Sequence, residues 1–230
     1  MIKLYNKLKE YTIDDTISLE NNDPQYKALE NLYSKINDKK QFFSLILVNS
    51  LLAYQLSSTG EKYWEEFSIC ADKYFCNKQY DTNNICKFFK DFLPKSKGNK
   101  RLLNMKLIRI TKIELFLEQF IPNLDNYLDN LAILRDELAN AMKQKKDAKT
   151  IVFAIKMILY GKRISNLDTQ INIINQITIP IDSRLEKIFD IYKEDYTDIK
   201  KFYRDLSIKL NIPEIHLDAI LWLKYKELTK

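Results

Sequence analysis

The chain has 230 residues, of which 46% are hydrophobic and 30% charged, and its 37 Lys and Arg against 31 Asp and Glu give a net charge of +6. A chain of this length forms one domain or two small lobes and can bury an apolar core without disulfides or metal. The composition excludes a disordered chain, and the modest positive charge permits a polyanionic partner without requiring one.

Glycine and cysteine usage excludes several kinds of site. With only three glycines, a glycine-rich phosphate loop of the Walker or Rossmann type is impossible. The three cysteines form no C-x-x-C pair, so we expect buried structural thiols in a reducing compartment and no metal site. They are Cys70, Cys76 and Cys86.

The sequence predicts an intracellular protein. The first residues are charged and amphipathic, unlike a signal peptide. The longest apolar run, residues 42–54, is too short to span a bilayer and contains polar residues, so a buried helix is the better interpretation. We expect a cytoplasmic, nucleoid-associated protein without membrane contact.

Apolar spacing in the first half of the chain predicts a series of helices. Asp23 is a capping residue for a helix over 24–36, with Pro24 at its favoured first position. Residues 40–56 are apolar nearly all round, which predicts a helix at the centre of the molecule. Thr59 then opens a helix that runs to residue 75. A shorter helix over 84–93 ends at a proline.

The second half continues the helical pattern. Long helices are predicted over 100–120 and 124–143, and a third after Asp147 as N-cap. Residues 165–179 contain a single charged residue, Asp168, and read as a long connection or a short strand-like excursion. Three more helices are predicted over 183–194, 197–210 and 213–228. The predicted fold class is therefore all-α.

The turn "KQKKDAK", residues 143–149, gathers lysines at the start of a helix, where backbone N–H groups can bind an anion. Its composition alone fits a solvated charge run, and the alternative is a hairpin that grips a DNA phosphate. Lys149 would stand in the first turn of the helix, where the dipole and the neighbouring cations favour its neutral, nucleophilic form. Such an amine suits Schiff-base chemistry.

The segment "IPIDSRLEKIF" places Asp182 just before a helix. Its simplest role is an N-cap, but a firmly held carboxylate can also stabilise a developing cation. Two aromatic side chains each stand one helical turn from a polar candidate: Phe153 after Lys149, and Trp222 after Asp218. Both pairs fit either a core or a slot for a flat heterocycle.

Three further residues carry weaker signals. Gln25 stands at a helix start, and Trp64 lies early in an amphipathic helix, so both can be structural. His216, the only histidine, has no acidic partner at a recognisable spacing and is expected to pack or cap rather than act as a base.

Six ordered blocks resemble one family. They are "DPQYKAL", "LLAYQLSSTGEKYWEEF", "NKRL", "KTIVFAIK", "IPIDSR" and "IPEIHLDAILWL", between about residues 23 and 224. Together they resemble the archaeal 8-oxoguanine DNA glycosylases, a branch of the helix-hairpin-helix glycosylases. The resemblance implies two helical lobes with the active site in the cleft between them. We expect one lobe from residues 1–38 with 180–230, and the other from 39–179.

The resemblance implies a bifunctional glycosylase and AP lyase that flips 8-oxoguanine out of DNA and cuts the strand by β-elimination, without metal or organic cofactor. By position, Lys149 matches the Schiff-base lysine and Asp182 the catalytic aspartate. Phe153 and Trp222 match the aromatics that sandwich the base. Three further residues match those that contact the edge of the base: Gln25, Trp64 and Asp218.

The implied partner is duplex DNA that contains 8-oxoguanine, with single-stranded DNA as a second candidate, and the implied state is a monomer. The hairpin lacks the glycines usual in the superfamily, so lysine side chains are candidates for phosphate contacts: Lys143, Lys145 and Lys146. Two alternatives stay open: a glycosylase of the same fold with another base preference, and a non-catalytic helical DNA-binding protein.

Overall fold

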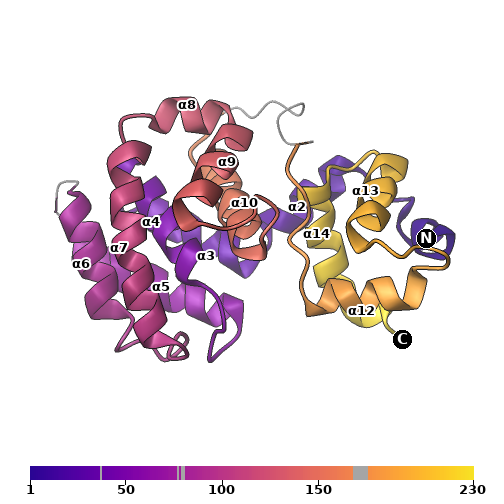
Figure 1. Ribbon diagram of the computed structural model, residues 1–230, viewed down its shortest axis with the longest axis horizontal. Helices are drawn as coiled ribbons and strands as arrows, with labels where there is room; N and C mark the ends of the chain where they lie inside the picture. The colour runs from indigo at the N-terminus through magenta and orange to yellow at the C-terminus, as the bar shows by residue number, and fades with distance from the viewer. Residues whose placement is uncertain (37, 77, 79–80, 168–175) are drawn as a thin grey trace. The chain divides into compact units, whose positions relative to one another are not determined.

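The structure is a computed structural model that describes residues 1–36, 38–76, 78, 81–167 and 176–230 (Figure 1). Within these residues the regular elements are all helices, which confirms the predicted fold class. None of these helices is long and apolar enough to cross a membrane. The chain divides into two compact units: unit 1 is Met1–Asp23 with Gln170–Lys230, and unit 2 is Pro24–Thr169.

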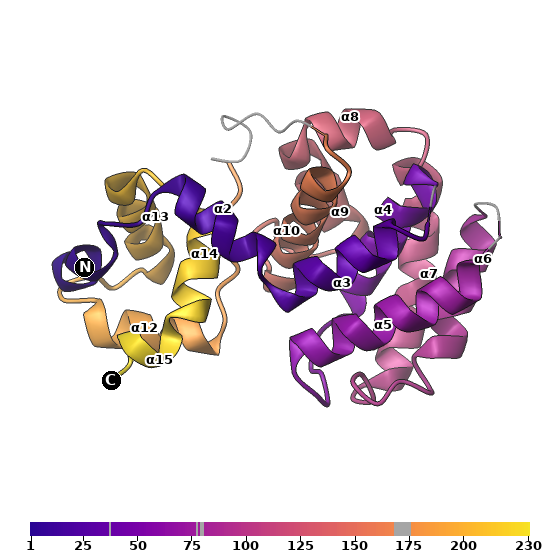
Figure 2. The ribbon, with the colours of Figure 1, turned by 180° about the vertical axis from the view of Figure 1, so that it is seen from behind.

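Unit 2 is built around one buried helix. Every residue of α4 from Gln41 to Leu52 is buried, as its apolar circumference predicts, and α3, α6, α7 and α10 pack on it. Figure 2 shows α3 and α5 side by side, with α4 beside α3. The helices of unit 2 are α3 (Pro24–Tyr33), α4 (Lys39–Leu52), α5 (Gly60–Phe75), α6 (Thr82–Phe92), α7 (Leu103–Phe120), α8 (Leu124–Asp129), α9 (Leu131–Met142) and α10 (Lys149–Ile164).

The helix predicted over 124–143 is in fact two helices. It breaks at Asn130, which ends α8 and then caps α9 by accepting a hydrogen bond from the backbone N–H of Ile133 (3.2 Å). Asn is a strong N-cap because its side-chain oxygen satisfies an N–H that has no partner inside the helix. Apolar periodicity continues across this break, which is why the pattern alone predicted one helix.

Unit 1 packs around α14. Eight consecutive residues of α14, Glu214–Leu221, are buried, and α2, α12, α13 and α15 contact it. The core includes Leu185, Phe202 and Leu217, all fully buried. The helices of unit 1 are α1 (Ile2–Leu8), α2 (Ile13–Asn21), α12 (Ser183–Tyr192), α13 (Ile199–Leu210), α14 (Glu214–Leu223) and α15 (Tyr225–Leu228). Part of the connection predicted over 165–179, residues 168–175, lies outside the described residues.

The observed units and the expected lobes differ in two places. Residues 176–179 were expected in the lobe with 39–179 but belong to unit 1, and residues 24–38 differ in the opposite sense. These residues were expected in the lobe with 180–230, whereas α3 belongs to unit 2. The reason is its packing on α5 and α10, where the ring centroids of Tyr26 and Tyr160 lie 5.3 Å apart. An amphipathic pattern shows that a helix buries one face, but it does not show which helix covers that face.

A buried pair in unit 1 gives His216 the acidic partner that its sequence neighbours lack. His216 Nδ1 lies 3.0 Å from Glu20 Oε2, and both side chains are buried. The expectation of a packing role fits, and the carboxylate partner is one that spacing along the sequence did not show. Glu20 is 196 positions away in the sequence, so no local spacing could reveal the contact.

The cysteines differ from one another in burial. Cys86 is buried, and burial raises the pKa of its thiol to about 12, whereas Cys70 is partly buried and Cys76 is exposed. The prediction of three buried thiols is therefore correct only for Cys86. Cys76 lies at the end of α5, where the chain leaves the core.

Lys106 makes the stability of the protein depend on pH. Its side chain on α7 is fully buried and donates a hydrogen bond to Asn99 Oδ1, and burial lowers its pKa from 10.5 to about 8. Between these values the unfolded chain binds more protons than the folded one, so the free energy of unfolding rises as pH increases from about 8 to 10.5.

The variant Lys106→Met should lose that rise, because methionine keeps most of the side-chain volume and does not titrate. Urea denaturation of both proteins at neutral pH and at about pH 10 checks this expectation through the difference between the two curves. An equal pH dependence in the variant would show that Lys106 does not release its proton in this range.

Candidate active site

Lys149 is the first residue of α10, in the first turn as predicted. The N-cap is Ala148 rather than Asp147, and alanine has no side-chain oxygen to cap the helix. No acidic residue lies in the first turn, and the Lys149 side chain is exposed. The positive end of the helix dipole acts on this amine.

The lysine-rich turn before α10 is shaped without glycine. Lys143 ends α9 in the left-handed conformation, with φ 53°, and its N–H donates to Ala139 and Asn140 carbonyls. Glycine is the usual residue at such a position, so Lys143 accepts some strain there. Lys143, Lys145 and Lys146 all have exposed side chains, which suits contacts made by side chains rather than by a glycine backbone.

Phe153 lies one turn after Lys149 and is partly buried. Trp64 on α5 supports it edge-on, with the ring centroids 6.2 Å apart and an angle of 66° between the planes. Trp64 is itself fully buried, so it fixes the orientation of Phe153 whatever else it contacts. A contact between Trp64 and a base stays a prediction.

Gln25 lies against the start of α5. A Cβ atom added to Gly60 would stand 2.6 Å from Gln25 Nε2, so the Gln25 amide occupies the space that a side chain at 60 would fill. Gly60 is one turn before Trp64 on the same helix. The structure thus brings Trp64 and Phe153 into direct contact, with Gln25 against α5 one turn before Trp64 and Lys149 one turn before Phe153 on α10.

In unit 1, Asp182 is the N-cap of α12, as predicted. Its Oδ1 accepts hydrogen bonds from the backbone N–H groups of Arg184 (3.0 Å) and Leu185 (3.1 Å). These two hydrogen bonds hold the carboxylate in place at the start of α12. Its second oxygen makes neither of these two capping bonds.

Asp218 and Trp222 stand one turn apart on α14. Asp218 is buried, and Trp222 is partly buried. The Arg184 guanidinium lies 3.7 Å from the centre of the Trp222 ring and 5.5 Å from that of Tyr225, a cation–π arrangement. Arg184 thus joins the Asp182 cap, through its N–H, to Trp222, through its side chain.

Both carboxylates act on one buried tyrosine. Burial raises the pKa of Tyr203, and the negative charges of Asp182 and Asp218 raise it further. The Tyr203 hydroxyl donates a hydrogen bond to the Leu185 carbonyl at 2.6 Å. The structure therefore brings Asp182 and Asp218 into one electrostatic environment of unit 1, although 36 positions separate them in the sequence.

Sequence reasoning missed two residues of these groups, Gly60 and Arg184. A glycine at a helix start and an arginine after a cap are both common, so neither carried a signal by itself. Lys156, one turn beyond Phe153 on α10, is a further candidate residue of the site. It is buried, and its Nζ lies 5.6 Å from the centre of the Tyr160 ring. Among the described residues, no three His, Cys, Asp or Glu side chains gather as metal ligands.

Similarity to known proteins defines the class of enzyme. The chain is 39% identical over 203 residues to an N-glycosylase/DNA lyase of Methanococcus maripaludis, which covers 87% of this chain and 77% of that protein. It is 36% identical over 225 residues to an N-glycosylase/DNA lyase of Thermococcus kodakarensis, covering 96% and 82%. The protein is therefore an enzyme of the DNA N-glycosylase/lyase class.

The family follows from a sequence model described as "AGOG: N-glycosylase/DNA lyase", which matches residues 5–230. The chain belongs to this family. The fold is shared with the crystal structure of 8-oxoguanosine-complexed Pa-AGOG, an 8-oxoguanine DNA glycosylase from Pyrobaculum aerophilum. The TM-score is 0.79 at 24% identity, with 96% of this chain and 86% of that chain covered. Membership in an enzyme family contradicts the non-catalytic alternative.

Proposed function

We propose that this enzyme excises 8-oxoguanine from DNA and then cuts the strand through a Schiff base on Lys149. The observation that carries the proposal is an exposed lysine at the first position of α10, one turn before Phe153, in a chain of the N-glycosylase/DNA lyase family. The likeness of fold to a glycosylase that holds 8-oxoguanosine supports the choice of base.

Base removal begins with displacement at the sugar. The neutral Lys149 amine attacks C1′ while the bond from C1′ to the base nitrogen breaks and its electron pair leaves with the base. Positive charge develops on the sugar, and the Asp182 carboxylate stabilises it. The attacking nitrogen loses one proton to the departing base and a second to the ring oxygen as the bond from C1′ to that oxygen breaks, which opens the sugar ring and gives the imine. Removal of a C2′ proton then expels the 3′ phosphate.

Recognition of the base requires that the nucleotide leave the helical stack, at a cost of a few kcal/mol. We propose that Phe153 and Trp222 recover part of this cost by stacking on the two faces of the base. Because Arg184 covers part of the Trp222 ring, the base stacks on the remaining face. Gln25 and Asp218 accept hydrogen bonds from the edge, including the N7 hydrogen that 8-oxoguanine has and guanine lacks.

We propose that the turn before α10 contacts the sugar–phosphate backbone of the DNA. Exposed Lys143, Lys145 and Lys146 neutralise phosphates beside the lesion, which makes binding sensitive to salt. The enzyme acts as a monomer on duplex DNA, and single-stranded DNA is a second substrate.

The test is a set of matched oligonucleotides that carry 8-oxoguanine, uracil or an alkylated purine, as duplexes and as single strands. We expect excision of 8-oxoguanine, and borohydride treatment during the reaction should give a covalent protein–DNA adduct. Preference for another base would overturn the assignment of substrate. Excision without an adduct would overturn the Schiff base.

Gly60 offers a way to displace Gln25 without removing it. In Gly60→Ala the new Cβ forces the Gln25 amide to move, so one hydrogen bond to the base is lost and kcat/KM should fall about tenfold. Because both changes remove the same contact, Gln25→Ala should add little in the Gly60→Ala background. Single-turnover kinetics of the four proteins check this, with thermal unfolding to confirm folding. Losses that multiply would contradict the shared contact.

A further inference from the structure

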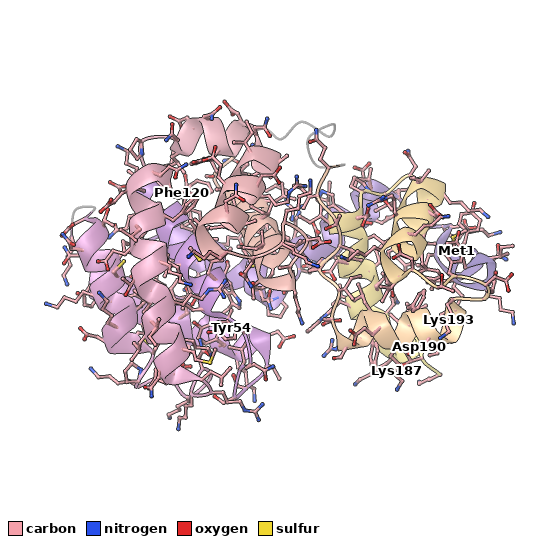
Figure 3. All side chains as sticks on the ribbon, viewed as in Figure 1. Met1, Tyr54, Phe120, Lys187, Asp190 and Lys193 are labelled. Atoms are coloured by element: carbon pink, nitrogen blue, oxygen red, sulfur yellow. The ribbon has the colours of Figure 1, made fainter. Side chains whose placement is uncertain are left out.

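Unit 2 contains a groove beside α7 that the residues above do not use. Its volume is about 300 Å³. Tyr54, labelled in Figure 3, stands at this groove against α7, with its ring centre 4.8 Å from Lys106 Nζ and 5.5 Å from Arg109 Cζ. The groove is lined by Tyr54, Met105, Ile108, Arg109, Lys112 and Met142.

The groove is positively charged. Arg109 and Lys112 line it, and its lining contains no acidic residue. The next acidic residue along α7 is Glu114, whose Oε2 lies 3.3 Å from Nζ of Lys90 on α6. On α9, Asp136 Oδ1 lies 2.6 Å from Arg135 Nη2. These two carboxylates are thus paired with cations outside the groove lining, and the charge that the groove presents attracts an anion.

Arg109 is held in position before any ligand arrives. Its Nη2 donates to Gln144 Oε1 at 2.7 Å, and its guanidinium lies over Tyr54. Its Nε is buried and has no hydrogen-bond partner. A cation fixed in this way loses little side-chain entropy when it binds a phosphate, which favours ordered binding over diffuse attraction.

Apolar side chains share the groove with these cations. The side chain of Met105 is 59% exposed and that of Ile108 is 67% exposed, although both face the groove with Tyr54. A surface that binds only phosphates needs cations alone. Exposed apolar and aromatic side chains beside cations fit a nucleic-acid strand with an unstacked base or sugar.

One side chain links the groove to the start of α10. Gln144 Oε1 accepts hydrogen bonds from Arg109 Nη2 and from Thr150 Oγ1, the latter at 3.1 Å. Thr150 follows Lys149 in the first turn of α10. Arg109 is therefore joined through Gln144 to the residue that follows Lys149, so the groove lies beside the start of α10.

We propose that the groove binds the DNA strand next to the damaged nucleotide. Arg109 and Lys112 contact phosphates, and one base or sugar lies on Ile108, Met105 and Tyr54. This inference rests on the proposed function, because it takes the strand at Lys149 as its starting point. It adds a binding site beyond the lysines of the turn.

The experiment measures binding to a duplex with a tetrahydrofuran abasic-site analogue, which the enzyme cannot cleave, over a range of salt concentrations. The exposed residue Lys112 gives the safest variant, Lys112→Met, and Arg109→Gln gives a second. Each should lower the slope of log Kd against log salt by about 0.9, the value for one phosphate contact. Ile108→Ser should weaken binding roughly tenfold with the slope unchanged.

The matched control is Lys87→Met, an exposed lysine on α6 of the same unit that does not line the groove. Thermal unfolding confirms that each variant is folded. If Lys112→Met and Arg109→Gln keep the slope of the control, the groove does not contact DNA. Borohydride trapping of the wild-type enzyme tests the proposed function separately, so a groove that fails beside normal trapping overturns only this inference.

Discussion

Replacing Lys149 with glutamine is expected to abolish base excision and strand scission together, with a loss of roughly 10³-fold or more. Glutamine cannot attack C1′ or form an imine, so both activities and the borohydride adduct should disappear. The side chain is exposed at the first position of α10, so the free energy of unfolding should change by less than about 0.5 kcal/mol. Single-turnover cleavage of an 8-oxoguanine duplex measures the effect.

Lys87→Gln is the control for this variant, since it removes an exposed lysine of α6 by the same substitution. It should cleave at the wild-type rate. If Lys149→Gln also excised the base and cut the strand at that rate, another nucleophile would be responsible and the mechanism proposed for Lys149 would fall.

Asp182→Asn is expected to separate capping from catalysis. Asparagine caps helices as well as aspartate, so the hydrogen bonds to the Arg184 and Leu185 N–H groups should persist and stability should fall by no more than about 1 kcal/mol. The negative charge that stabilises the sugar cation is lost, and excision should slow by about 10²- to 10³-fold.

Asp198 supplies a matched control in the same unit. It caps α13 through the same two kinds of contact, accepting from the N–H groups of Lys200 (2.8 Å) and Lys201 (3.3 Å). Asp198→Asn should have the same small effect on urea denaturation and none on excision. Equal excision by the two variants would leave Asp182 as a cap and nothing more.

The candidate site could be predicted from sequence only where a residue contacts others close to it in the chain. Asp182 before α12 and Thr59 before α5 are caps whose partners lie within three residues, and both were found. The start of α10 was misplaced slightly, with Asp147 in place of Ala148 as N-cap, because a carboxylate near a helix start fits several positions. The roles of the site residues came from resemblance and await the variants above.

The contacts that join distant segments could not be predicted in this way. The side chains of Glu20 and His216 are in contact although 196 positions separate them, and Arg109 donates a hydrogen bond to Gln144, 35 positions away. Arg184 lies on Trp222, and Gln25 lies against Gly60, although each pair stands on two separate helices. Single residues of these types are common in any sequence and gain meaning only from their neighbours in space.

Local patterns of residues are enough to specify the helical class, the buried central helix α4 and the caps that begin several helices. Periodicity and capping depend on residues within one or two turns, and that information is complete in the linear chain. The pairing of helices, such as α3 with α5 and α10, and the grouping of side chains from different helices are seen only in the folded protein. Those contacts depend on the packing of whole faces, and many pairs of apolar faces are compatible with the same pattern.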